Sequence, residues 1–257
     1  MRYDLRAMSV GAILDRALRI YVRHFWMLLA ISLVFSVPMA SLYFFIAASA
    51  RPDPMDQTVI TLFGSMVYAG IVVAFLQGTL VQAVSDIYLG IPASLGRSLR
   101  LAVSRSFPLL VGTFLYTALT TLGMMACILP GLFLTGALCA VIPIVVLEHR
   151  GPIDAISRSW ELTSGMRRRA FATVFFSQLQ VAFVAYAIAL PAGAMQAPPL
   201  QTQALTHVVT ALVQPYMAIV LILLYYDLRV RREAFDLQVL AVELGRTPSP
   251  PPATPAP

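Results

Sequence analysis

The chain has 257 residues, of which 59% are hydrophobic and only 12% are charged. Soluble domains carry about 25% charged residues, so this composition excludes an ordinary soluble domain. The formal net charge of +6 would suit nucleic acid, but the basic residues flank apolar runs, and the sequence therefore predicts no nucleic-acid partner.

Long runs without Asp, Glu, Lys or Arg divide the chain. They lie between Arg23 and Arg51, from Thr58 to Ser85, from Ser106 to Leu147, and from Ala170 to Tyr226. A bilayer core needs about 20 helical residues, so the first two runs hold one span each and the last two hold two each. The predicted spans are residues 25–48, 59–84, 107–128, 132–147, 170–193 and 205–226.

Proline and glycine mark where the chain leaves the spans. Leu129-Pro130-Gly131 interrupts the third run, because proline after a helix end and glycine at a turn are typical breakers. It predicts a tight hairpin between the third and fourth spans. Residues 1–246 then form the membrane domain, and the proline-rich residues 247–257 are predicted to be a disordered tail.

The arginines orient the predicted spans. All 18 basic residues are arginines, and only Arg51 falls outside the segments before the first span and after the second, fourth and sixth. Positively charged residues stay on the cytoplasmic side of membrane proteins. The sequence therefore predicts a multi-pass protein of the inner or plasma membrane with both termini in the cytoplasm.

Three arginine-containing stretches have the pattern of amphipathic helices: SVGAILDRALRIYVRHF, IPASLGRSLRLAVSRSF and GPIDAISRSWELTSGMRRRAF. They align on Arg16, Arg97 and Arg158, and each ends at a phenylalanine that begins a span. Such helices can lie in the membrane interface, although soluble loops are the alternative. We expect an all-α integral membrane six-helix bundle with three repeats, each an interfacial amphipathic helix plus a transmembrane hairpin.

The first of these stretches, together with PGLFLTGALCAVIPIVVLEHRGPIDAISRSWELTSG and LLYYDLRVRREAFDL, resembles the glycerophosphoryl diester phosphodiesterase membrane-domain family and the related YciC-like multi-pass membrane proteins. The resemblance extends from Ser9 to Leu237. It implies a membrane domain, which in those enzymes is attached to a separate catalytic barrel. Because 257 residues leave no room for such a barrel, the resemblance implies a fold and no reaction.

Catalytic motifs are missing from the sequence. It has no HExxH, P-loop or GxSxG motif and no metal-ligand spacing of Cys and His. Its three histidines, His24, His149 and His207, fall in different regions, and no carboxylate is predicted in the middle of a span. We expect neither an enzyme nor a cofactor or metal site.

Glutamines supply the most polar groups inside the predicted spans. Gln178, Gln180 and Gln214 could line a path for a polar substrate, or they could form hydrogen bonds between helices. The first interpretation gives an alternative function, transport of a small solute or lipid through the bundle.

The candidate interaction surface consists of charged residues after the fourth and sixth spans, with Trp160 among them and Arg16 before the first span: Arg16, Glu148, Arg158, Trp160, Glu161, Asp227, Arg229, Arg231 and Arg232. They could pin the interfacial helices to the bundle through salt bridges. They could also dock anionic lipid headgroups or a membrane or cytoplasmic protein partner. The expected function is a non-catalytic membrane protein that organises lipids or partner proteins at the cytoplasmic face.

The topology is testable with reporter fusions. Because the arginines orient the spans, reporters fused after Asp56 and Gln201 should be external, and reporters after Ser94, Glu161 and Leu237 should be cytoplasmic. Compartment-specific enzyme activity of the reporter measures each location. A reversed location at any one junction would contradict the six-span topology.

Overall fold

The computed structural model describes residues 7–49, 59, 63, 68–194 and 199–234, and within those ranges it is helical with no strand. Arg51 and the predicted tail at 247–257 lie outside these residues. The elements are α1 (Val10–Arg23), α2 (Phe25–Ser49), η1 (Tyr68–Val72), α4 (Val73–Tyr88), α5 (Leu95–Ser104), α6 (Ser106–Ala126), α7 (Ile128–Ala137), α8 (Val141–Leu147), α9 (Pro152–Leu162), α10 (Arg167–Ala194) and α11 (Pro199–Glu233).

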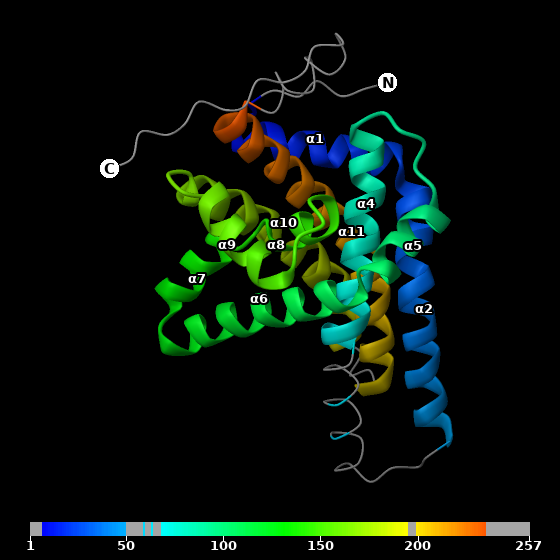
Figure 1. Cartoon of the computed structure of the whole chain (residues 1–257). Coiled ribbons are helices and arrows are strands. Elements are labelled where there is room, and N and C mark those ends of the chain that lie inside the picture. The colour runs from blue at the N-terminus through cyan, green and yellow to red at the C-terminus, as the bar shows by residue number, and fades with distance from the viewer. Residues whose placement is uncertain (1–6, 50–58, 60–62, 64–67, 195–198, 235–257) are drawn as a thin grey trace.

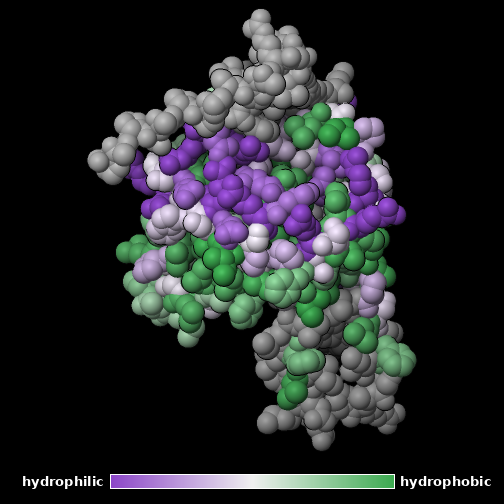
Figure 2. Space-filling model, viewed as in Figure 1, coloured by the Kyte–Doolittle hydropathy of each residue, from purple (hydrophilic) through white to green (hydrophobic). Residues whose placement is uncertain are grey.

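Six stretches among the described residues are long and apolar enough to cross a membrane, so the all-α six-helix fold class is confirmed. In Figure 1, α2, α4 and α11 form one group, and the hairpin of α6 and α7 extends to one side of it. Figure 2 shows hydrophilic side chains gathered in one band, with hydrophobic surface below it. We call the end of the bundle that carries this band the charged end.

The three predicted amphipathic stretches form α1, α5 and α9. Ser9 and Ser94 begin α1 and α5 by accepting hydrogen bonds from backbone amides of the first turn, the usual role of an N-cap serine. Each helix buries one narrow stripe, as α1 does with Ile13, Ala17 and Ile20. The exposed side of each helix carries charged residues together with large apolar ones, such as Leu18 in α1.

Helix α11 is longer than the predicted span at 205–226, since it continues to Glu233. The extension is polar, and pairs one turn apart support it. Arg231 is 3.1 Å from Asp227 and Arg229 is 3.0 Å from Glu233. Oppositely charged residues four positions apart stabilise a helix, so α11 continues beyond the end of its apolar run.

The predicted break at Leu129-Pro130-Gly131 is in the wrong place. The chain leaves the helical conformation at Cys127, and α7 already begins at Ile128. Pro130 then lies in the first turn of α7, where its missing N–H removes no hydrogen bond. Gly131 packs so closely on α6 that a Cβ there would lie 2.6 Å from the backbone nitrogen of Met124.

A second break, at residues 138–140, divides the predicted fourth span into α7 and α8. Side chains of α9 and of Thr163 directly after it satisfy the backbone groups that this break frees. Ser159 and Thr163 donate hydrogen bonds to the carbonyl of Ala137, at 2.9 and 3.1 Å. The Ser159 hydroxyl also accepts from the amide of Ala140 at 3.3 Å. A broken apolar helix is tolerated where other groups replace its backbone partners.

Substitution of Gly131 by alanine tests the α6–α7 contact. The added methyl group would collide with the backbone of Met124, and overpacking costs about 1–3 kcal/mol. We expect the free energy of unfolding in detergent to fall by that amount. Gly11→Ala is the matched control, because a Cβ at Gly11 meets no atom within 4 Å. Equal effects of the two substitutions would contradict the close packing.

Candidate functional site

A carboxylate that is buried or nearly buried lies at the charged end of each even-numbered span. Asp86 is in the last turn of α4, Glu148 follows α8 directly, and Asp227 is in the last two turns of α11. Their side chains are 5%, 12% and 0% exposed, respectively. A buried charge is tolerated only with good partners, and arginines surround all three.

Asp86 joins α4 to α5. Its carboxylate forms an ion pair with Arg97 of α5 and accepts a hydrogen bond from the amide of Gln82 at 3.1 Å. Arg97 also donates to the carbonyl of Pro92 at 3.3 Å. The guanidinium therefore fixes the connecting segment as well as the two helices.

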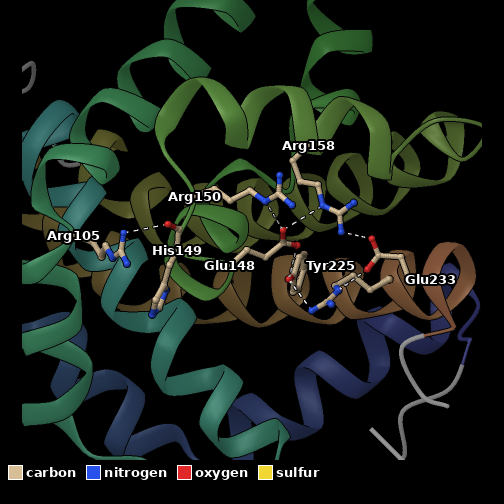
Figure 3. Close-up of polar contacts among 8 residues, drawn as sticks. Arg105, Glu148, His149, Arg150, Arg158, Tyr225 and Glu233 are labelled. Carbon is tan, nitrogen blue, oxygen red and sulfur yellow. Dashed lines mark hydrogen bonds and ion pairs between the residues drawn. The ribbon is translucent and has the colours of Figure 1, made fainter. Parts of the chain in front are cut away.

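Glu148 is the centre of the largest ion-pair network (Figure 3). It is 3.0 Å from Arg150 and 3.2 Å from Arg158 of α9, and it accepts a hydrogen bond from the Tyr225 hydroxyl of α11 at 3.0 Å. Arg158 forms a second ion pair with Glu233. One carboxylate and one guanidinium thus join α8, α9 and α11.

Arg229 is a third arginine in this network. It donates to Glu233 at 3.0 Å and to the Tyr225 hydroxyl at 3.2 Å. Burial by itself would lower the pKa of Arg158, but hydrogen bonds and charge from Glu233 and Glu148 raise it above its ordinary value. Arg158 therefore keeps its charge at any physiological pH.

The turn beside Glu148 is fixed by a backbone contact. His149 has a φ of 59°, a left-handed conformation that ends many helices. Its carbonyl accepts a hydrogen bond from Arg105 at 3.2 Å, as Figure 3 shows. Arg105 lies between α5 and α6, so this contact joins the α5–α6 connection to the turn between α8 and α9.

Asp227 joins the start of the described chain to the end of α11, and we call its contacts with Met8 the clip. Its carboxylate accepts from the backbone amide of Met8 at 2.7 Å and from Arg169 of α10 at 3.0 Å. Arg231 binds the same carboxylate at 3.1 Å and donates to the Met8 carbonyl at 3.1 Å. Both backbone groups of Met8, just before α1, are therefore held.

The arginines that align in the sequence have related partners. Arg97 and Arg158 each pair with the carboxylate that ends the preceding span, 11 and 10 residues earlier. Arg16 differs, because it donates to the Tyr88 hydroxyl at 3.5 Å. The ring of Tyr88 stacks on that of Tyr226, with 5.3 Å between centroids.

The remaining residues of the predicted surface lie further out. Trp160 is 40% exposed, and the guanidinium of Arg167 lies 4.0 Å from its ring centroid, a cation–π contact. Arg232 donates to the Ser164 carbonyl at 3.3 Å. The side chain of Glu161 is exposed and forms no ion pair or hydrogen bond with the other described residues.

Asp86 was missed because it lies just past the predicted second span. Its position in the sequence could have identified it, because an acidic residue ends each even-numbered span. In addition, an aligned arginine follows Asp86 after 11 residues and Glu148 after 10 residues. The hydroxyls of Ser159 and Thr163 gave a weaker signal. They are four residues apart and share one face of α9.

The three glutamines of the predicted polar path separate into two places. Gln178 and Gln214, with Gln77, line a cavity of about 170 Å³ among α4, α6, α8, α10 and α11. Gln180 lines a different groove and accepts a hydrogen bond from Tyr216. Residues two apart on a helix point to nearly opposite sides, which explains the separation.

Among the described residues, no group of three or more His, Cys, Asp or Glu side chains is arranged to hold a metal ion. The buried acids instead face arginines.

Comparisons of the chain with protein-family models, curated proteins and solved structures find no match. The resemblance to the glycerophosphoryl diester phosphodiesterase membrane domain therefore stays a prediction. The function has to be argued from the arrangement of the charged end and the helices below it.

Asp227→Asn tests the clip on Met8. Broken buried ion pairs cost about 3–5 kcal/mol, and Arg169 and Arg231 are partly exposed. We expect a loss of about 2–3 kcal/mol in the free energy of unfolding in detergent, measured by denaturation. Glu161→Gln is the matched control and should change stability by less than about 0.5 kcal/mol. A loss no larger than that of the control would show that the clip contributes nothing.

Proposed function

We propose that this chain is a non-catalytic multi-pass protein of the inner or plasma membrane, with both ends in the cytoplasm, that organises lipids or a partner protein at its cytoplasmic face. The observation that carries the proposal is the charged end. Buried carboxylates fix its surface helices there, and some arginines remain available to solvent or lipid.

Arg100 of α5 and Arg168 of α10 are these available arginines. Both are exposed, and neither side chain forms a hydrogen bond or ion pair with the other described residues. An arginine near the anionic inner leaflet of a membrane contributes about 1 kcal/mol of attraction. Trp160 suits the same depth, because tryptophan prefers the boundary between headgroups and tails.

The resemblance to the membrane domain of glycerophosphoryl diester phosphodiesterases supports a role in the membrane. That resemblance rests partly on the stretch from Pro130 to Gly165. In this stretch Glu148, Arg158, Ser159 and Thr163 all make tertiary contacts. The motif is thus accounted for by structural roles, which favours a non-catalytic module.

The cavity between Gln77, Gln178 and Gln214 favours a second candidate, transport of a small polar solute. The side-chain amides of these three glutamines form no hydrogen bond with other described residues. At about 30 Å³ per water molecule, the volume of about 170 Å³ holds a few waters. Ligand pockets usually measure about 300–1,000 Å³, so the size favours the organising role over transport.

The double substitution Arg100→Gln/Arg168→Gln tests lipid organisation. Polymer-bounded nanodiscs retain the lipids nearest the protein, and mass spectrometry gives their headgroup classes. We expect anionic lipids to be enriched around the native protein relative to bulk membrane. The double variant should lose enrichment severalfold, because each arginine contributes about 1 kcal/mol.

Arg51→Gln is the control for this experiment, since Arg51 is predicted on the opposite side and should not affect enrichment. A recurring protein that copurifies with the native chain would support the partner arm of the proposal. Absence of both lipid enrichment and a partner would refute it. Solute flux in proteoliposomes that Gln178→Leu abolishes would establish transport instead.

A further inference from the structure

A large apolar groove opens between α1, α10 and α11. Its volume is about 1050 Å³, at the upper end for small-molecule sites. Leu18 and Tyr21 of α1, Phe183 and Val184 of α10, and Val213 and Tyr216 of α11 are among its lining residues. Leu18 and Phe183 are 53% and 75% exposed, so the groove is open along one side.

The polar atoms in the groove wall are already used. The Tyr21 hydroxyl donates to the Leu212 carbonyl at 2.8 Å, and the Tyr216 hydroxyl donates to the side-chain carbonyl of Gln180. Tyrosine hydroxyls that find partners in this way leave the apolar ring face for contact. The wall therefore suits a hydrocarbon occupant better than a polar solute.

The position of the groove points to a lipid chain. Helices α10 and α11 belong to the stretches long and apolar enough to cross a membrane. Helix α1 closes the groove at the charged end, where α1 contacts both helices. In a bilayer, the molecules that reach an open apolar groove at this depth are lipid acyl chains.

The edge of the groove carries one charged pair. Asp15 of α1 lines the groove and lies 2.5 Å from Arg19, and the two side chains are 60% and 71% exposed. Adjacent opposite charges complement a zwitterionic headgroup, with the carboxylate facing an ammonium and the guanidinium facing a phosphate. An anionic headgroup would instead meet the carboxylate of Asp15 unfavourably.

We propose that this groove binds a phospholipid with a primary-amine headgroup, such as phosphatidylethanolamine. An acyl chain lies against Phe183 and Val184, Asp15 binds the ammonium, and Arg19 binds the phosphate. A primary ammonium has three N–H donors for the carboxylate, whereas a quaternary ammonium has none. This inference rests on the proposed membrane location and adds a lipid class and a site to it.

Photoreactive lipids test this proposal. The full chain is reconstituted in vesicles containing a phospholipid with a diazirine in its acyl chain and either an ethanolamine or a glycerol headgroup. After illumination, mass spectrometry maps the labelled peptides. We expect labels to concentrate at residues 179–184 and 212–216, with the ethanolamine probe labelling severalfold more than the glycerol probe.

Two variants separate the chain site from the headgroup site. Gly11→Phe places a ring in the groove, since Gly11 lines it and a Cβ there meets no atom within 4 Å. It should abolish the concentrated labelling, and Gly96→Phe, at an equally open glycine of α5, should not. Asp15→Asn/Arg19→Gln should keep the labelling but remove the preference for ethanolamine.

Several results would overturn the proposal. One is equal labelling of the native chain by the two probes, and a second is labelling that Gly11→Phe leaves unchanged. A third is labelling of Phe114 and Leu122, on the exposed face of α6, that is as dense as the labelling of the groove. Exclusion of both probes by a second copy of the chain would also overturn it. The arginine variants that test anionic-lipid enrichment leave Asp15 and Arg19 intact, so either proposal can fail without the other.

Discussion

The structure depends on one constraint: a carboxylate buried at the end of an apolar helix needs a cation. Asp86, Glu148 and Asp227 each impose this requirement, and an unpaired buried charge would cost several kcal/mol. Partners on the surface helices meet it for the first two. For Asp227 the partners come from α10 and α11, and the clip reaches the start of α1 through the backbone of Met8. The surface helices thus have fixed places at the charged end.

The sequence predicts how many long apolar helices there are and where the surface helices lie, because the distribution of charged and apolar residues along the chain decides both. Charge-free runs mark the apolar helices, and arginine-bearing amphipathic patterns mark α1, α5 and α9. The helix breaks could not be predicted in the same way. The break at Cys127 depends on how closely Gly131 packs on Met124, and the break at residues 138–140 depends on hydroxyls supplied by α9. Both are tertiary contacts that local sequence does not encode.

Most charged residues at the charged end could be listed from the sequence, although Asp86 was missed, but their pairing could not. Charge composition places Arg158, Glu148 and Asp227 in one cluster, but the order of ion pairs follows from helix packing. Gln178 and Gln180 illustrate the opposite case. Their spacing of two residues already places them on different faces of a helix, so local geometry alone separates the two into the small cavity and the apolar groove.

The clip and the groove both involve α1. Asp227 and Arg231 hold Met8 directly before α1, and α1 closes the groove and carries Asp15. The Tyr21 hydroxyl donates to a backbone carbonyl of α11 at 2.8 Å, further along α1. The wall that α1 gives to the groove is therefore held at both ends, and the charged end supplies one of the two contacts.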